Sequence, residues 1–597
     1  MVDLRLQVVA TVLGVALAAA AAGSSSGKQF EFQEATVDAI HQGFRNGSLT
    51  STALARFYLE QIARLNPLLR AVIEVNPDAL AQAARADAER AASRGRCAVG
   101  LHGIPVLLKD NIDTRDRLNT TAGSLALLGS VVRRDAGVVA RLRRAGAVIL
   151  GKANPSEWSN FRPVASGWSA RGGQTLVRLQ MLFFSAPSSS YGYGDRRRHG
   201  CNKSDAAMRE ITESICSLGN PMRVKRWAWR CGGSQHGGGD TWIGDRRLHP
   251  LPVVAQLGGR DQTHCWVDEP IRCHPHHASS RHYWVRNRKY PPVSSKMSDS
   301  KHRSSLVPVV RCRPMCRTVS DAVRVLDVIV GYDELDAEAT GAASKYIPHG
   351  GYTQFLRTNG LRGKRIGVPD VFFQGYDDMQ LAVYEKHLDT MRQQGAVVIM
   401  DLDIATNFTD LGNQEILLMA AEFKISINAY LSGLLYSPVR SLAQVIAFNE
   451  AHPVEVTKQC FCLPHCREPM MSFPAVLLQE RLKDFGQPDL IAAEKTNGIG
   501  TRERAAIRRL REISTNGLEK LMKERRLDAI VAPNSDASSV LAVGGYPGIA
   551  VPAGYDEQGV PFAICFGGLQ GYEPRLIEIA YAFEQATKVR RPPTFKR

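Results

Sequence analysis

One lysine in this sequence has a setting that could support chemistry. Lys109 ends the apolar run 104–108 and is followed by Asp110 and Asn111. A short apolar run of this kind predicts a buried β-strand, which would place Lys109 at the carboxyl end of that strand. A lysine in such a place is usually a solvated strand tip. It becomes a candidate general base only where burial disfavours the ammonium form and leaves a neutral amine.

A second candidate cluster is weaker. The segment 456–479 contains four possible metal ligands, Cys460, Cys462, His465 and Cys466. A zinc site of this kind needs a second half at matching spacing, and none follows. The sequence therefore predicts no metal site and no cofactor. Five of the twelve cysteines lie between residues 201 and 273, in a block discussed below, so no disulfide framework is predicted either.

The elements around Lys109 alternate between helix and strand. Residues 30–95 carry apolar positions at helical spacing, and strand, helix and strand follow between residues 101 and 154. The same rhythm returns after residue 318. There the sequence predicts a helix from residue 319, strands at 365–368 and 528–531, and a final helix at 576–584, with an apolar run at 548–551. Such alternation predicts an α/β fold around a central sheet.

The first residues have the layout of a targeting segment. Arg5 precedes an apolar run from residue 6 to residue 22 that ends in small residues, which is typical of a secretory signal peptide. We predict a signal peptide over residues 1–22 and a location in the secretory pathway or outside the cell; an uncleaved anchor is the alternative. Beyond that segment no apolar run is long enough to predict an integral membrane span. Glycosylation sequons that fit this route begin at Asn46, Asn119, Asn202 and Asn407.

The charge of the chain is concentrated in one block. Of the net charge of +17, residues 176–317 contribute +14, from 24 Lys and Arg against 10 Asp and Glu. Residues 176–313 show no sustained periodicity, so we expect them to be disordered or poorly packed. Arginine with interleaved tryptophan and tyrosine suits a nucleic-acid-binding insertion, which is a remote alternative function. Because the secretory start disfavours that alternative, we predict no nucleic-acid partner.

Several segments together resemble one family. They lie at residues 103–111, 121–124, 146–154, 172–175, 545–547, 551–555 and 584–587. In this order they resemble the motifs of the amidase signature family, over residues 34–175, 316–455 and 478–595. The resemblance implies one amidase domain at residues 30–595, interrupted by aberrant segments at 176–313 and 456–479. It also implies an amidase signature fold, with a central mixed sheet flanked by helices on both faces.

The chemistry implied by the resemblance uses a serine nucleophile, a second serine with a cis peptide bond, and a lysine. Lys109 occupies the position of the family's catalytic lysine. The partner would be a small-molecule amide, whose acyl group passes to the enzyme serine and then to water, with no metal or cofactor. An amide carbonyl is a poor electrophile, so the serine hydroxyl needs a base within hydrogen-bonding reach. The family spans fatty amides, aryl amides, peptides and glutaminyl-tRNA precursors, and this sequence does not select among them.

Both serine motifs are missing where the family places them, after Gln174 and Thr175. Read in a frame shifted by one base, the codons of residues 212–284 can encode the family's motifs in order. The two serine codons would overlap Val224 and Leu248. We interpret residues 176–211 and 285–313 as retained introns that enter and leave the wrong frame, and 456–479 as a third intron in frame. The sequence therefore predicts an amidase by descent that is inactive as written; the alternative is a non-enzymatic homologue or an artefact of gene prediction.

Overall fold

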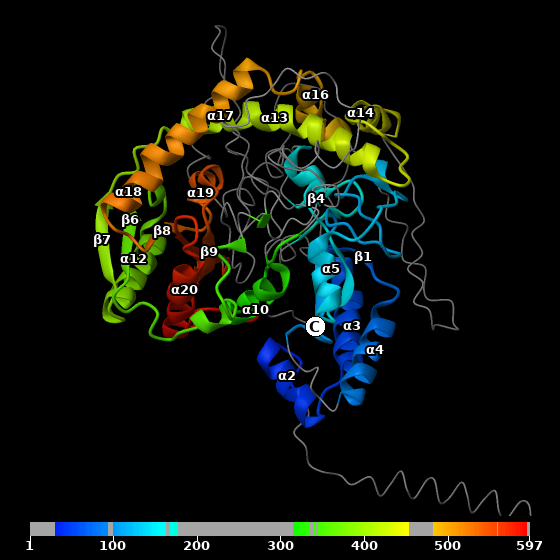
Figure 1. Ribbon diagram of the computed structural model, residues 1–597, viewed down its shortest axis with the longest axis horizontal. Helices are drawn as coiled ribbons and strands as arrows, with labels where there is room; N and C mark the ends of the chain where they lie inside the picture. The colour runs from blue at the N-terminus through cyan, green and yellow to red at the C-terminus, as the bar shows by residue number, and fades with distance from the viewer. Residues whose placement is uncertain are drawn as a thin grey trace, which may run out of the picture.

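The computed structural model of the protein describes residues 30–93, 100–162, 167–176, 314–333, 340–341, 344–452, 482–557 and 559–593. Three predicted segments lie outside these ranges: the signal peptide at 1–22, the basic block from residue 177 to residue 313, and the cysteine-containing segment 456–479. The described residues form two sheet-centred regions under a long arching helix (Figure 1).

The first region is built on a three-stranded sheet. Its strand order is β1-β3-β2, with β1 antiparallel and β2 parallel to the central β3. The strands are β1 (Val72–Val75), β2 (Pro105–Lys109) and β3 (Val148–Ala153). Four helices accompany them: α2 (Val37–Asn46), α3 (Ser51–Leu69), α4 (Ala79–Ala92) and α5 (Gly137–Arg144). A small hairpin of β4 (Trp168–Ser169) and β5 (Gly173–Gln174) follows this sheet in the chain.

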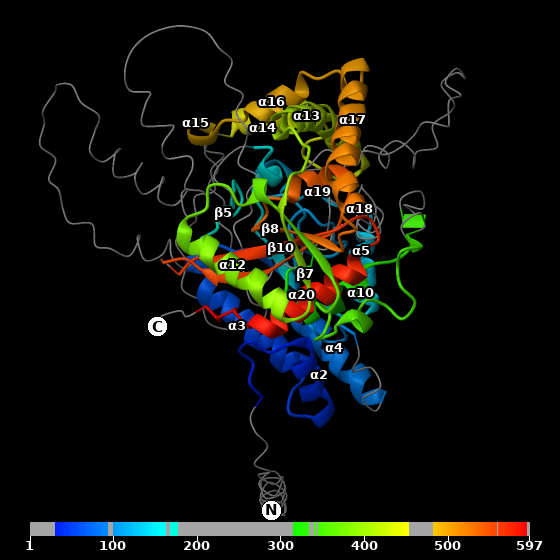
Figure 2. The same cartoon turned by 90° about the vertical axis from the view of Figure 1, so that its left-hand side faces the viewer.

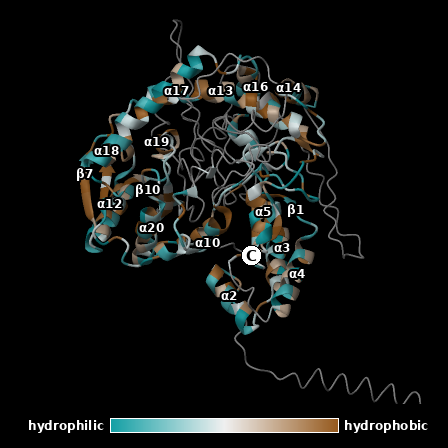
Figure 3. Ribbon diagram, viewed as in Figure 1, coloured by the Kyte–Doolittle hydropathy of each residue, from teal (hydrophilic) through white to brown (hydrophobic). Residues whose placement is uncertain are grey.

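The second region is built on a mixed five-stranded sheet with strand order β7-β6-β8-β10-β9. The strands are β6 (Arg365–Pro369), β7 (Val397–Leu402), β8 (Ala529–Pro533), β9 (Gly548–Tyr555) and β10 (Pro561–Gly567). Parallel pairs join β6 to β7 and β8, whereas β10 runs antiparallel to both β8 and β9. The outermost strand, β7, exposes Val397 and Met400, and it is brown at the left edge of Figure 3.

Helices cover both faces of the five-stranded sheet because its central strands alternate between two cores. Ala529 and Val531 of β8 face a core shared with α10 (Val319–Ile329), α12 (Asp378–Gln393) and α20 (Glu573–Thr587). Ile530 and Ala532 face the opposite core, shared with α13 (Phe408–Gly433), α17 (Thr501–Ser514), α18 (Lys520–Glu524) and α19 (Ser538–Gly544). Successive residues of a strand point to opposite faces, so a strand buried on both faces is apolar throughout. Figure 2 shows α12 and α20 lying across one face of the sheet and α19 on the other side.

The helix α13 joins the two regions. The Asn407 side chain accepts a hydrogen bond from the backbone of Asp410 and so begins the helix. Near its start, Leu411 and Leu418 lie in the core of the five-stranded sheet. Near its end, Phe423 and Ile427 lie in a separate core with residues from the first region. The helices α14 (Leu442–Ala451), α15 (Leu482–Phe485) and α16 (Pro488–Glu494) complete that end of the molecule.

The predicted α/β fold, with mixed sheets flanked by helices, is confirmed. The predicted helix from residue 319 is α10, and the predicted strands at 365–368 and 528–531 are β6 and β8. The prediction that residues 104–108 form a strand is correct, but the prediction that this strand is buried is wrong in part, because Leu107 is 43% exposed. The reason is that β2 is an edge strand among the described residues, paired on one side only. Of the helices described here, none has the length and apolarity required to cross a membrane.

Candidate functional site

Two lysines lie on opposite faces of the three-stranded sheet. In the parallel pairing of β2 with β3, Leu108 lies opposite Lys152, and Lys109 lies opposite Ala153. Paired residues of neighbouring strands share a face, and successive residues alternate. The amines of Lys109 and Lys152 therefore enter different environments, although the residues belong to adjacent strands.

Lys109 reaches a hydroxyl group. Its amine donates a hydrogen bond of 3.2 Å to the Oγ of Ser159, which is 50 residues away in the chain. The lysine is partly exposed and Ser159 is 7% exposed. The fold thus places a serine hydroxyl beside the lysine that the sequence singled out as the candidate base.

The backbone that carries Ser159 has an unusual conformation. Trp158, Ser159 and Asn160 have φ values of 48°, 51° and 72°, so three successive residues other than glycine are left-handed. The left-handed conformation costs roughly 1–2 kcal/mol per residue for residues with a Cβ. Such strained segments persist only where the surrounding structure fixes them, and they gather at functional sites.

A buried ion pair fixes this turn. Glu157 accepts a 3.1 Å hydrogen bond from Arg162, and both side chains have zero exposure. The second oxygen of Glu157 accepts from the backbone N–H of Ala170 at 2.8 Å. Burial raises the pKa of Glu157, and the charge of Arg162 opposes that shift. Because Glu157 and Arg162 bracket the strained residues, their pairing holds both ends of the turn.

Aromatic packing holds the same turn from α13. Trp158 is completely buried and meets Phe423 edge to face, with ring centroids 6.2 Å apart. Phe161 stacks on the same Phe423 ring at 3.9 Å. Aromatic pairs of this kind contribute roughly 0.5–1.5 kcal/mol beyond the area that they bury, and together they offset part of the cost of the strained backbone.

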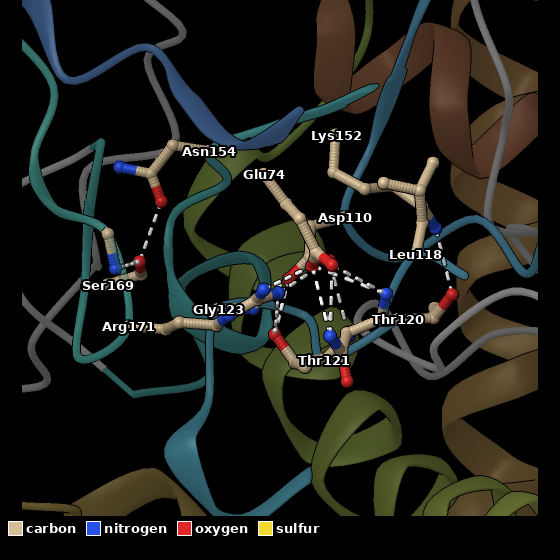
Figure 4. A network of polar contacts seen from close by, with 12 residues as sticks. Glu74, Asp110, Leu118, Thr120, Thr121, Gly123, Lys152, Asn154, Ser169 and Arg171 are labelled. Atoms are coloured by element: carbon tan, nitrogen blue, oxygen red, sulfur yellow. Dashed lines mark hydrogen bonds and ion pairs between the residues drawn. The ribbon is translucent and has the colours of Figure 1, made fainter. Parts of the chain in front are cut away.

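On the other face of the sheet, Lys152 is sealed from solvent. Its amine donates to the backbone oxygen of Ile112 at 2.6 Å and to the hydroxyl of Thr120 at 2.8 Å. Burial lowers the pKa of Lys152, and the nearby carboxylates of Asp110 and Asp113 oppose that shift. Figure 4 shows this lysine beside the polar network that follows Lys109 in the chain.

Asp110 is the centre of that network. It accepts hydrogen bonds from the Thr121 hydroxyl and from the backbone of Gly123, and it pairs with Arg171 at 3.3 Å. Arg171 also pairs closely with Glu74 of β1 (Figure 4). The pKa of Asp110 is raised by burial, while the charges of Arg171 and Lys152 oppose the shift. This network ties the end of β2, and hence the backbone of Lys109, to β1 and to the β4–β5 hairpin.

Gly123 has to be glycine for this network to form. Its φ is +77°, and a Cβ at this position would lie 2.5 Å from the Cβ of Ser169 in the β4–β5 hairpin. The hairpin could then not approach the turn that binds Asp110. The resemblance segment 121–124 therefore contacts the hairpin that also carries the segment 172–175.

Asp113 links the sealed face to α13. The hydroxyl of Tyr430 donates to Asp113 at 2.9 Å, and both residues are buried. Burial raises the pKa of Asp113 well above its usual value, and this effect outweighs the opposing hydrogen bond from Tyr430. The direction of this shift favours the neutral form of Asp113.

Sequence reasoning identified one residue of this site and missed the others. Lys109 lies at the strand end where it was predicted, and its catalytic role stays a prediction. Lys152 and Arg171 lie in or beside resemblance segments, but no local pattern signalled that they are buried. The signal that could have found Glu157 and Arg162 is their flanking of the aromatic pair in the run 157–162.

The remaining predictions concern metals and cysteines. Within the described ranges, no group of three or more His, Cys, Asp or Glu side chains could hold a metal ion. The cluster that contains Cys460 and His465 lies outside those ranges, so its prediction stays untested. Two cysteines lie within the described ranges: Cys565 is buried, and Cys316 is a partly buried free thiol.

The known proteins that this chain resembles in sequence and in structure include several amidases. The family model described as Amidase matches residues 53–166. A protein of Arabidopsis thaliana named as a probable amidase is 43% identical over 573 residues, covering 95% of this chain and 92% of that protein. The peptide amidase of Stenotrophomonas maltophilia is 31% identical with a TM-score of 0.64, covering 95% of this chain and all of that one. A bacterial aryl acylamidase of the amidase signature family, 16% identical with a TM-score of 0.53 and covering 93% of this chain and 96% of that one, shares the fold.

Proposed function

Because this chain belongs to the amidase signature family, we propose that it descends from an enzyme that hydrolysed a carboxylic amide through a serine acyl-enzyme, with Lys109 as the base. The observation that supports Lys109 most strongly is its 3.2 Å hydrogen bond to a serine hydroxyl at the carboxyl end of β2. A base in this chemistry must lie within hydrogen-bonding reach of the hydroxyl that it deprotonates.

The surroundings of Lys109 suit a fixed base. Asp110 holds the next peptide through Thr121 and Gly123, and Arg171 holds Asp110. A catalytic group is effective only when its position is set before the substrate arrives. The buried network behind β2 supplies that fixation.

We also propose that the chain as written does not turn over amides. The two serines of the family's triad are absent from the positions that follow Thr175. The match to the family model ends at residue 166, shortly before the block that we interpret as frame-shifted. Without the family's serine nucleophile and the turn that carries it, the lysine lacks the acyl acceptor that the family uses for amides. The alternative proposal, a non-enzymatic homologue, shares this expectation.

The location and the substrate class are further parts of the proposal. The apolar run 6–22 supports a secretory route for the protein. The likeness to a peptide amidase over 95% of the chain makes a peptide amide the first substrate to try.

The test is to sequence the mature transcript across the codons of Gln174 to Val319 and to assay both possible products. If the transcript lacks the two unmatched stretches, its product is expected to release ammonia from a peptide amide, and Lys109→Ala is expected to abolish that release. The chain as written should release none. Turnover by the chain as written would overturn the proposal that it is inactive. An active corrected product that is indifferent to Lys109→Ala would overturn the role of the lysine.

A further inference from the structure

The Lys109–Ser159 pair is a serine and a lysine in contact that the family triad does not account for. Ser159 lies outside the block where the family's two serines belong, in the turn between β3 and the β4–β5 hairpin. A serine whose hydroxyl is bonded to a lysine amine is a known nucleophile arrangement on unrelated folds. The contact therefore places a candidate nucleophile, the Ser159 hydroxyl, beside a candidate base, the Lys109 amine.

The Ser159 hydroxyl is held in place by structure on both sides of it. Its neighbour Trp158 is buried against Phe423, and the Glu157–Arg162 pair closes the turn. Ser159 cannot take an ordinary helical or extended conformation without breaking these contacts. A nucleophile on a sharp, strained turn is presented to its base at little further entropic cost.

The lysine of the pair is accessible from solvent. Lys109 is partly exposed, whereas Ser159 is buried, with 7% of its surface exposed. The other lysine of the three-stranded sheet, Lys152, has no exposed surface and donates hydrogen bonds to Ile112 and Thr120. Of these two lysines, Lys109 therefore combines contact with a serine hydroxyl and partial exposure to solvent.

We propose that Ser159 and Lys109 form a nucleophilic pair that is acylated once by activated esters, without the family's serines. The Ser159 Oγ forms a bond to the acyl carbon, the bond to the phenolate leaving group breaks, and the hydroxyl proton passes to the Lys109 amine and then to solvent. The products are an acyl-Ser159 ester and a free phenolate, so no oxidant, metal or second reactant is required.

Activated esters are the substrate class because their leaving group needs no protonation. A phenolate with electron-withdrawing substituents departs as the anion, whereas an amide nitrogen must receive a proton and its oxyanion must be stabilised. We therefore expect one acyl group per chain and no sustained turnover. This inference rests on the proposed role of Lys109 as a base but not on the family's serines.

The experiment is to treat the full chain with p-nitrophenyl acetate and to measure p-nitrophenolate release and the acetylated residue by peptide mass spectrometry. A burst approaching one equivalent, with the acetyl group on Ser159, is expected. Ser159→Ala should remove the burst, and Lys109→Met should slow it at least tenfold. Acetylation of Lys109 in place of Ser159, or an unchanged burst in Ser159→Ala, would overturn the inference.

Two further variants keep the result interpretable. Ser156→Ala changes a serine in the same turn, whose hydroxyl accepts from the backbone of Gly167, and it should retain the burst. Ser159→Cys should react with iodoacetamide, and Lys109→Met should slow that reaction; equal rates with and without the lysine would contradict the pairing. Neither result depends on amide turnover, so failure here would leave the proposed amidase descent standing.

Discussion

The two faces of the three-stranded sheet differ in what they offer a lysine. On one face, Lys152 is sealed between the backbone oxygen of Ile112, the hydroxyl of Thr120 and buried carboxylates. On the other face, Lys109 is partly exposed and donates a hydrogen bond to the hydroxyl of Ser159. Residues that are neighbours in the sheet can thus serve stability and chemistry separately. This difference shows how a buried charged network on one face of a strand can fix the position of a more accessible residue on the other face.

The sharpest way to break this comparison is to replace each lysine with methionine. Lys152→Met leaves Ile112 and Thr120 without their buried donor and removes a positive charge near Asp110 and Asp113. We expect it to lower the free energy of unfolding by about 2–5 kcal/mol. Lys109→Met should change that free energy by less than about 1 kcal/mol, because its amine is partly solvated. Urea denaturation of the two variants measures both values, and similar losses would show that the faces are not distinct.

The buried Glu157–Arg162 pair allows the support of the Lys109 face to be tested. Glu157→Gln removes the carboxylate that pairs with the buried Arg162, and we expect a loss of about 3 kcal/mol. The matched control is Glu524→Gln, which removes the exposed pair with Lys520 and should cost less than about 0.5 kcal/mol. Thermal unfolding followed by circular dichroism compares the two. A Glu157→Gln protein as stable as the control would remove the argument that this pair holds the strained turn.

A carboxyl group that lies outside both faces of the three-stranded sheet also makes the stability of the protein depend on pH. Glu584 of α20 accepts a 2.8 Å hydrogen bond from the backbone of Val319, and burial raises its pKa to about 7. A raised pKa in the folded state means that its contribution to stability is complete below the unfolded pKa of about 4.3 and is lost as pH rises through about 7.

Glu584→Gln should therefore gain stability relative to the parent chain as pH rises from 4 to 8, by up to about 3 kcal/mol. Glutamine retains the oxygen that Val319 requires. Denaturation midpoints at a series of pH values test this expectation, and a constant difference between the two proteins would contradict it.

The smallest expected effect concerns Asp113 and Tyr430 on the sealed face. The pKa of Asp113 is shifted upward, as is that of Glu584. The parent chain should therefore lose stability as pH rises above the ordinary pKa of an aspartate. Asp113→Asn should remove that loss and be the more stable protein at pH 8. Tyr430→Phe, which deletes the hydrogen bond to Asp113, should cost about 1 kcal/mol. An Asp113→Asn protein less stable than the parent chain at pH 8 would contradict this expectation.

Much of the fold could be predicted from the sequence, because helix and strand periodicity is local. The strand ending at Lys109, the helix beginning at Val319 and the strand around Ile530 all follow from short apolar patterns. The exposure of Leu107 could not be predicted, because it depends on whether another strand pairs with β2. Lys152 and Arg171 were missed for a related reason: a charged residue becomes a buried partner only through residues far away in the chain, such as Glu74 for Arg171.

The helix α13 has a consequence for how the molecule loses its structure. Its first half lies in the core under the five-stranded sheet, and its second half lies in the core that buries Trp158. Unfolding either core would remove the packing partners of one half of this continuous helix. The packing of the other half would then be weakened. The two sheet regions should therefore lose structure in a single calorimetric transition, so that a lesion beside the Ser159 turn lowers the heat resistance of α17 and α19 at the far end of the molecule.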